Sequence, residues 1–311
     1  MAQPSSKQDE LSFLDQEREF VVSGKDLWDW WQWARQEAIA YEISPNEADW
    51  LLQALTNLDR LALRLGSFQD RDQVQLKVPQ HTLKSLWQQR IKQRVPVQYL
   101  VGETTWREFS LQVSPAVLIP RPETELLIDL AITHSPTHSC SHWTDLGTGS
   151  GAIALGLATA FPDATIHAVD VSAEALAIAQ ANAAAYQLIE RIHFYQGSWL
   201  EPLSHLKGQL SGMVSNPPYI PSQQVLELQL EVTQHEPHLA LDGGTDGLDC
   251  IRQLVAAAPD YLQSGGLWMV EMMAGQAEAV VDLLQQNGNY IDIQIHHDLA
   301  GIERFAIARR T

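Results

Sequence analysis

The run HWTDLGTGSGAIAL at residues 142–155 decides the fold of this chain. A short apolar strand that ends at Asp145 passes through a glycine turn, residues 147–151, into an apolar helix that begins at Ala152. A glycine turn between a strand and a helix lets a ligand approach the backbone closely, at the N-terminus of the helix. The run therefore predicts an α/β domain with a ligand at the carboxyl end of a sheet strand.

Two acids indicate which ligand this turn suits. The glycine pattern alone fits a nicotinamide or flavin nucleotide as well as S-adenosylmethionine. A carboxylate at Asp145, just before the first glycine, would repel a pyrophosphate but suits the cationic amino acid end of S-adenosylmethionine. Asp170 ends a second strand-like run and lies 23 residues after Gly147, about the spacing at which an acid binds a ribose diol. These features favour S-adenosylmethionine.

A third segment follows the strand-like residues 192–195. Gln196, Gly197 and Ser198 allow a turn, and Trp199 follows them. An indole at this place can pack on an adenine ring, although, taken alone, plain core packing explains it better.

The tetrad Asn216-Pro217-Pro218-Tyr219 follows a short buried strand and suits the methylation of a planar nitrogen. The Asn216 side-chain oxygen can accept one N–H of an amide or exocyclic amine, and the Pro217 carbonyl can accept the other. The two prolines fix the backbone, and Tyr219 supplies a flat face for stacking. Taken alone, the tetrad could also be an ordinary proline-containing turn.

Several motifs together give the chain a family resemblance. The motifs are PVQYLVG at 96–102, VLIPRPETE at 117–125, DLGTGSG at 145–151, NPPYI at 216–220, Glu236-Pro237 with Ala240-Leu241, residues 246–249, Gly265-Gly266 with Glu271, Gly275-Gln276, and DLAG at 298–301. On these motifs the chain resembles the peptide chain release factor glutamine methyltransferases over about residues 90–311. One departure is Trp106-Arg107-Glu108-Phe109, where the family prefers Phe-x-Gly-x-x-Phe.

The resemblance implies a fold and an activity. It implies a seven-stranded, Rossmann-like S-adenosylmethionine-dependent methyltransferase domain at residues 121–311. An all-α substrate-docking domain at residues 1–95 and a β-hairpin connector at residues 96–120 would precede it. The implied reaction moves a methyl group to the side-chain amide nitrogen (N5) of the glutamine in the Gly-Gly-Gln motif of class 1 release factors.

The resemblance also implies a role for each site residue. Asn216, Pro217 and Tyr219 are the implied catalytic residues, and with Pro218 they bind the substrate glutamine. The implied cofactor-binding residues are Asp145, Leu146, Gly147, Thr148 and Gly149 on the methionine side, Asp170 at the ribose, Trp199 by the adenine, and Asn216. Arg121, Glu123 and Thr124 are left outside the catalytic set, since these residues could equally cap a helix and lock the connector.

Charge narrows the choice of substrate. The 311 residues include 20 Lys and Arg against 38 Asp and Glu, a net charge of −18. Nucleic-acid binding normally needs a basic stripe, so the balance weighs against an adenine-N6 methyltransferase, which shares the tetrad and stays the alternative. A non-catalytic sensor of S-adenosylmethionine is disfavoured, because a sensor has no need of the paired acceptors. We expect no direct nucleic-acid binding.

Composition indicates a cytoplasmic protein without a metal. There is no run of 18 apolar residues and no basic-then-apolar start, so we expect neither a membrane anchor nor a signal peptide. Two cysteines are too few for a disulfide framework. His134, His138, Cys140 and His142 lie within nine residues, but methyl transfer from a sulfonium needs no metal, and we expect none here.

The first hundred residues read as helices. We expect one helix after Ser23, a second from Ser44 through a leucine-rich stretch to Gly66, and a third over residues 82–94. Trp28, Trp30, Trp31 and Trp33 have helical spacing and are expected mostly in the core, with two at the rim. In the connector, residues 99–102 and 109–113 are expected to pair as strands.

Overall fold

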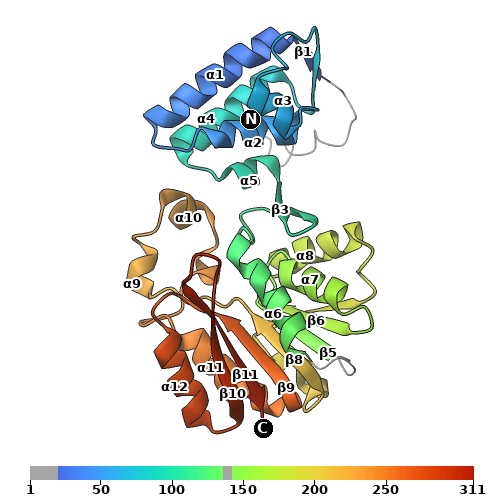
Figure 1. Ribbon diagram of the computed structural model, residues 1–311, viewed down its shortest axis with the longest axis vertical. Helices are drawn as coiled ribbons and strands as arrows, with labels where there is room; N and C mark the ends of the chain where they lie inside the picture. The colour runs from blue at the N-terminus through green and yellow to red at the C-terminus, as the bar shows by residue number, and fades with distance from the viewer. Residues whose placement is uncertain (1–19, 136–141) are drawn as a thin grey trace, which may run out of the picture. The chain divides into compact units, whose positions relative to one another are not determined.

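The computed structural model describes residues 20–135 and 142–311. The chain forms two compact units, unit 1 over Met1–Val101 and unit 2 over Gly102–Thr311 (Figure 1). In the described residues, no helix is long and apolar enough to cross a membrane.

Unit 1 is built mainly from helices. Ser23 caps the first of them, because its side chain accepts a hydrogen bond from the Asp26 N–H at 3.0 Å. Trp30 and Trp31 lie in the core, while Trp28 and Trp33 are partly exposed, as the helical spacing predicts. Two short strands, which the sequence analysis did not anticipate, pair antiparallel beside the helices. The elements are β1 Phe20–Val22, α1 Gly24–Ala40, α2 Asn46–Leu55, α3 Arg60–Leu65, β2 Val74–Leu76, α4 Gln80–Gln93 and α5 Val97–Val101.

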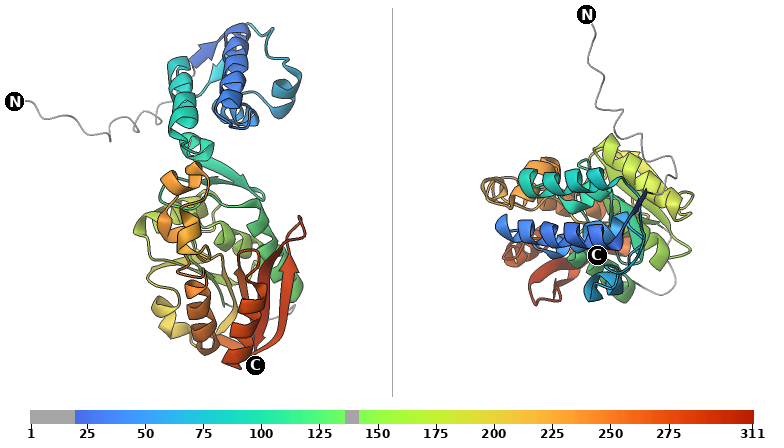
Figure 2. Two further views of the ribbon diagram at one scale, coloured as in Figure 1. Left: turned by 90° about the vertical axis from the view of Figure 1, so that its left-hand side faces the viewer. Right: turned by 90° about the horizontal axis from the view of Figure 1, so that it is seen from above.

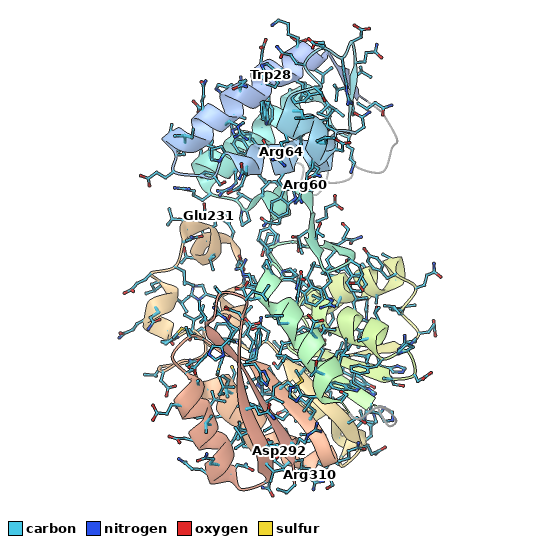
Figure 3. The ribbon with its side chains drawn as sticks, in the orientation of Figure 1. Trp28, Arg60, Arg64, Glu231, Asp292 and Arg310 are labelled. Atoms are coloured by element: carbon cyan, nitrogen blue, oxygen red, sulfur yellow. The ribbon has the colours of Figure 1, made fainter. Side chains whose placement is uncertain are left out.

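The expectation of one helix from Ser44 to Gly66 is wrong. The chain is extended at Thr56, whose hydroxyl donates to the Leu52 carbonyl at 2.6 Å and accepts from the Leu58 N–H at 3.0 Å. Asp59 then caps α3 by accepting from the Ala62 N–H. Side-chain hydrogen bonds of Thr and Asp to the nearby backbone compete with the helix, so the leucine-rich stretch forms two helices. Arg60 and Arg64 lie on the second one, exposed (Figure 3).

The connector differs from the expectation at its start. Residues 97–101 form a helical turn, with the Pro96 carbonyl accepting from the Tyr99 and Leu100 N–H groups, so the first predicted strand is wrong. The hairpin itself exists one step later, as β3 Glu103–Trp106 and β4 Phe109–Gln112. Trp106 and Phe109 are both buried, which means that the departure from the family pattern keeps an apolar anchor on each strand.

Unit 2 is a seven-stranded mixed sheet between two layers of helices (Figures 1 and 2). The strand order is β10-β11-β9-β8-β5-β6-β7, with β11 antiparallel to both of its neighbours. Side chains of alternate strand residues, such as Val214 and Met213 on β8, enter two separate apolar cores. The fold is the Rossmann-like one that the glycine turn predicts. The strands are β5 His142–Leu146, β6 Thr165–Asp170, β7 Ile192–Gln196, β8 Leu210–Ser215, β9 Leu262–Glu271, β10 Tyr290–His297 and β11 Glu303–Arg310.

The helices divide between the two faces of this sheet. Side chains of α6, α7 and α8 lie in one core, and side chains of α11 and α12 lie in the other. Two short helices, α9 and α10, stand beyond the carboxyl ends of the strands (Figure 1). The bounds are α6 Leu126–His134, α7 Ala152–Ala160, α8 Ala173–Ala185, α9 Ser222–Val225, α10 Leu230–His235, α11 Asp249–Ala257 and α12 Ala277–Asn287.

Candidate active site

A cavity of about 610 Å³ opens at the carboxyl ends of the parallel strands. Each of the four loops that follow β5, β6, β7 and β8 contributes to its wall, as expected for an open α/β sheet. Most of the predicted site residues therefore meet in one place. Those on the wall are Gly147, Thr148, Gly149, Asp170, Trp199, Asn216 and Pro218.

The glycine turn is held open by hydrogen bonds to β6. The N–H groups of Gly147 and Thr148 both donate to the Val169 carbonyl, at 2.9 and 3.0 Å. Gly149, with φ of 53°, donates its N–H to Asp170 at 2.9 Å. A Cβ at Gly149 would meet no atom within 4 Å, so this backbone is open to a ligand.

Asp145 lies beneath the turn and outside the cavity wall. Its Oδ2 accepts from the Thr148 hydroxyl at 2.6 Å and from the Ala154 N–H at 3.0 Å, so the acid ties the turn to the start of α7. Its Oδ1 is buried and has no hydrogen-bond partner among the described residues. Burial raises the pKa of Asp145 to about 7, and nearby Asp170 adds to the rise. An oxygen left without a partner can still accept a donor from a ligand.

Leu146 also lies away from the cavity. Its side chain is fully buried in the apolar core that contains Leu200, and its carbonyl accepts from the Ser215 hydroxyl at 2.6 Å. Any contact of Leu146 with a cofactor would thus be through the backbone.

Asp170 and Trp199 both line the cavity. The two carboxylate oxygens of Asp170 accept one backbone N–H each, from Gly149 and from Ser172, which fixes the side chain and leaves lone pairs on both oxygens. Trp199 packs partly in the core and lies against Gly147, where a Cβ would be 3.7 Å from the indole ring. The indole therefore serves core packing and forms part of the wall.

The tetrad begins where β8 ends, and a network of hydrogen bonds holds it. The Asn216 amide nitrogen donates to the Thr124 hydroxyl at 3.2 Å. That hydroxyl donates to Glu271 at 2.6 Å, and the Tyr219 hydroxyl donates to the other oxygen of Glu271 at 2.8 Å. Among the described residues, no hydrogen bond is recorded to the Asn216 side-chain oxygen or to the Pro217 carbonyl.

A smaller pocket of about 130 Å³ adjoins the cavity. Pro217 and Tyr219 line this pocket alone, whereas Asn216 lies on the wall of both compartments. The remaining wall is largely apolar and includes Leu228 and Val232 from the α9–α10 region. Asn216 thus stands at the junction of the two spaces.

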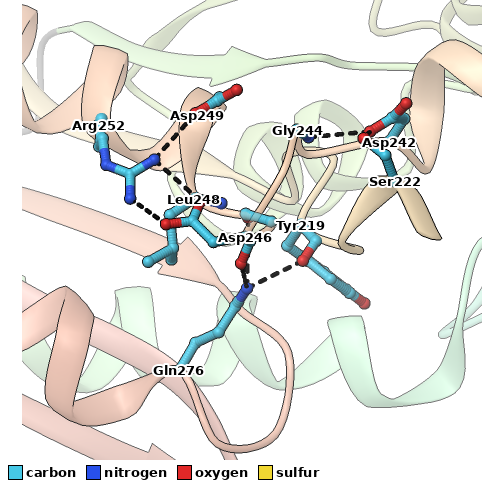
Figure 4. Close-up of polar contacts among 10 residues, drawn as sticks. Tyr219, Ser222, Asp242, Gly244, Asp246, Leu248, Asp249, Arg252 and Gln276 are labelled. Carbon is cyan, nitrogen blue, oxygen red and sulfur yellow. Dashed lines mark hydrogen bonds and ion pairs between the residues drawn. The ribbon is translucent and has the colours of Figure 1, made fainter. Parts of the chain in front are cut away.

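Gln276 supports the tetrad from outside (Figure 4). Its side-chain nitrogen donates to the carbonyls of Tyr219 at 3.0 Å and Gly247 at 3.3 Å, while its oxygen accepts from the Met273 N–H at 2.9 Å. The Gly275-Gln276 pair of the family pattern was the one sequence signal for this contact.

An ion pair ties two segments of the wall together. The Arg121 guanidinium donates to both oxygens of Glu236, at 2.8 and 2.9 Å. The Glu236 side chain is 2% exposed, and burial raises the pKa of its carboxyl while Arg121 opposes that rise. Arg121, Thr124 and Glu271 are not among the site residues that the sequence predicts.

The histidines and cysteine near residue 140 lie partly outside the described residues, because His138 and Cys140 are not described. The His134 ring packs on His296, and His142 Nδ1 is 3.0 Å from His167 Nε2. Within residues 20–135 and 142–311, no group of three or more His, Cys, Asp or Glu could hold a metal ion.

The fold and the cavity suit a methyltransferase, and comparison with known proteins shows that class of enzyme. Residues 124–244 match the methyltransferase small domain, and residues 29–102 match the PrmC N-terminal domain. The chain is 55% identical to the release factor glutamine methyltransferase of Synechocystis sp. over 93% of this chain and 97% of that protein. The corresponding protein of Thermosynechococcus vestitus is 48% identical, over 93% of this chain and 99% of its own length.

The chain belongs to the release factor glutamine methyltransferase family. Among solved structures, the catalytic domain of hMettl16 in complex with a 3′UTR hairpin is similar with a TM-score of 0.54, covering 83% of this chain and 88% of that one. At 12% identity, this likeness shows the fold alone.

Proposed function

We propose that this methyltransferase uses S-adenosylmethionine to methylate the side-chain amide nitrogen of the glutamine in the Gly-Gly-Gln motif of class 1 release factors. Family membership supports the reaction and the partner. The observation that carries the proposal is the hydrogen bonding of the Asn216 side chain. Its amide nitrogen donates to Thr124, and among the described residues no hydrogen bond reaches its oxygen, which leaves that oxygen available to a substrate N–H.

The cavity suits the proposed cofactor in three places. The open backbone at Gly147–Gly149 admits a close ligand, the fixed carboxylate of Asp170 can accept two ribose hydroxyls, and the Trp199 indole offers an apolar wall to the adenine. The buried Oδ1 of Asp145 can accept a donor that penetrates to the floor of the turn. S-adenosylmethionine supplies a methyl group on a positively charged sulfur, a good leaving group.

The chain's own residues hold the substrate nitrogen. Asn216 Oδ1 and the Pro217 carbonyl accept the two N–H groups of the glutamine amide, and the Tyr219 ring lies against its plane in the smaller pocket. Because Asn216 lines both compartments, a nitrogen bound there faces the cavity of the cofactor. Orientation of this kind can supply about 7 kcal/mol or more of the barrier.

Charge supports the same assignment during the reaction. A carbon–nitrogen bond forms as the carbon–sulfur bond breaks, and the nitrogen becomes partly positive before its proton leaves for solvent. Two carbonyl-type oxygens aimed at that nitrogen favour the developing charge. No strong base is required of the chain.

The first test is methyl transfer from labelled S-adenosylmethionine to three substrates in parallel: a class 1 release factor, its Gly-Gly-Ala variant, and duplex DNA. Label on the unaltered release factor alone is the expected result, and it also locates the target glutamine. Label on DNA would instead support adenine methylation, and label on neither would contradict both activities. The low cysteine count makes the cytoplasm the proposed site of action.

The second test removes the proposed acceptor. Asn216→Ala should abolish turnover, because the amide nitrogen loses one of the two acceptors that hold it, while cofactor binding stays largely intact. Turnover by single-cycle kinetics and cofactor binding by calorimetry check both parts. Near-normal turnover in this variant would rule out Asn216 as the group that holds the substrate amide.

A further inference from the structure

The hydrogen bonds around Thr124 have a fixed direction. A threonine hydroxyl has one proton, and Thr124 donates it to Glu271 at 2.6 Å. The hydroxyl must then act as acceptor toward Asn216, 3.2 Å away, so the Asn216 atom that faces it is the amide nitrogen. Tyr219 gives its own proton to the other Glu271 oxygen at 2.8 Å. Both carboxylate oxygens are thereby committed to the tetrad and its support.

We propose that Glu271 and Thr124 are positioning residues that set which end of the Asn216 amide faces the substrate. With the nitrogen turned to Thr124, the oxygen is presented to the glutamine, and the site accepts an N–H donor. With the amide flipped, the nitrogen would be presented, and the site would favour a substrate oxygen. This inference rests on the proposed function and explains its choice of an amide over a carboxylate.

The arrangement is built from three parts of the chain that are far apart in sequence. Thr124 comes from the 3-10 turn Pro122–Glu125, Glu271 from the end of β9, and Asn216 from the end of β8. Strands β8 and β9 are parallel neighbours in the sheet, with Ser215 opposite Val270, so the residues that follow these two, Asn216 and Glu271, lie side by side. Thr124 is 4% exposed and Glu271 is fully buried, which leaves solvent little access to the chain of donors.

Burial of the Glu271 carboxylate costs free energy, which argues that the residue is there to position the Asn216 amide. Burial raises the pKa of the Glu271 carboxyl, and Glu123 raises it further, while the hydroxyls of Thr124 and Tyr219 and the charge of Arg304 oppose the rise. Among the described residues, the hydrogen bonds to the carboxylate come from two hydroxyls, that of Thr124 on the cavity wall and that of Tyr219 in the smaller pocket, rather than from a cation. A buried acid held in this way is weak support for stability alone.

Two changes at Thr124 separate the hydroxyl from the packing. Thr124→Ser keeps the donor and acceptor, so it should retain kcat within about 3-fold. Thr124→Val keeps the shape but offers Asn216 no acceptor, so kcat should fall about 10- to 100-fold, which is the scale of a lost orientation. KM for S-adenosylmethionine should stay unchanged in both variants.

A matched control comes from Thr144, another buried threonine whose hydroxyl donates one hydrogen bond, to the His167 carbonyl at 2.8 Å. Thr144→Val should lower the melting temperature about as much as Thr124→Val does, without the drop in kcat. If Thr124→Val and Thr144→Val lose stability alike and both keep full kcat, the positioning role is refuted.

Glu271→Gln reverses the polarity of the network while keeping its shape. A glutamine side chain has an oxygen acceptor at one position and an NH2 donor group at the other. When the NH2 group faces Thr124, the threonine hydroxyl accepts from it, turns its own proton toward Asn216, and flips the Asn216 amide. The readout is competition by a release factor carrying Gly-Gly-Glu. Wild type should discriminate strongly against this carboxylate competitor, and Glu271→Gln should reduce the discrimination about 10-fold or more, along with kcat.

The outcomes distinguish this inference from the proposed function. Should wild-type enzyme fail to methylate the unaltered release factor, the proposed function itself has failed. Should wild type be active and Glu271→Gln retain both its kcat and its preference for Gly-Gly-Gln, the function stands and the positioning role falls. Loss of kcat in Thr124→Val, its recovery in Thr124→Ser, and weaker discrimination in Glu271→Gln together support the proposal.

Discussion

The stability of the folded free enzyme with Asp145→Asn, taken relative to wild type, should be greater at alkaline pH than at acid pH. Asp145 is fully buried, and one of its oxygens has no hydrogen-bond partner among the described residues. Burial raises its pKa from 3.8 to about 7, so the ionised side chain destabilises the folded state. Asparagine keeps an acceptor for the Thr148 hydroxyl and the Ala154 N–H but never ionises.

The magnitude follows from the size of the pKa change. Between pH 3.8 and about 7 the folded state binds more protons than the unfolded state, so the Asp145 contribution to stability falls as pH rises and is constant above that window. A shift of about three units corresponds to about 4 kcal/mol in all. Between pH 5.5 and pH 8 the wild type should therefore lose about 2 kcal/mol that the variant keeps.

The measurement is native-state hydrogen exchange of the β5 peptide at both pH values, since it reports the opening of unit 2 by itself. Comparing the variant with wild type at each pH cancels all other titrating groups. It also cancels any cost of about 1–3 kcal/mol from an unpaired amide nitrogen, because that cost does not depend on pH. A difference between the two proteins that is the same at both pH values would refute the argument that burial raises this pKa.

Three further changes test the packing and the wall of the site. Gly212→Ala would place a Cβ 2.3 Å from the Trp143 ring, so it should cost about 1–3 kcal/mol, and an unchanged melting temperature would contradict this contact. Arg121→Met leaves the Glu236 carboxylate buried and unpaired, which should cost on the order of 3 kcal/mol in urea unfolding; adding Glu236→Gln should recover part of the loss. Trp199→Ala should weaken binding of S-adenosylmethionine about 10-fold in calorimetry, and unaltered affinity would leave the indole with core packing alone.

Local signals in the sequence predicted the fold of unit 2 well. The glycine turn, the acid at the end of β6 and the tetrad after β8 each lie where a strand ends, and parallel strands in neighbouring positions bring their carboxyl ends to one edge of the sheet. The same reasoning placed Asp145 beside the ligand, although the structure puts its carboxylate beneath the turn. The side-chain direction at the end of a strand depends on register, which the motif does not reveal.

Contacts between residues far apart in the chain could not be predicted from the sequence. Thr124 and Glu271 are 147 positions apart, and either one alone looks like an ordinary polar residue at the end of an element. Their meeting depends on the order of β8 and β9 in the sheet and on the path of the connector. The errors in unit 1 have the opposite cause, since the hydrogen bonds at Thr56 and Asp59 are local but override a strong apolar pattern.

Charge around the cavity explains why the family substrate is an amide and not a nucleic acid, although the fold is shared with a domain solved in complex with an RNA hairpin. Residues 102–311 carry 8 Lys and Arg against 24 Asp and Glu, a net charge of −16. The charged residues on the cavity wall are Arg121, Asp170, Glu174 and Asp242.

Among the described residues of that wall, the cation is Arg121, and it is paired with Glu236. Arg310 lies at the other end of unit 2 from Glu231, which is on α10 (Figure 3). A phosphate entering the cavity would meet three carboxylates and release few counterions, so electrostatics would oppose its binding. A neutral glutamine side chain meets no such repulsion, and its two N–H groups match the oxygens of Asn216 and Pro217. Adding salt should accordingly leave methylation of a Gly-Gly-Gln peptide nearly unchanged, and a steep loss of activity with salt would mean that phosphate contacts hold the substrate after all.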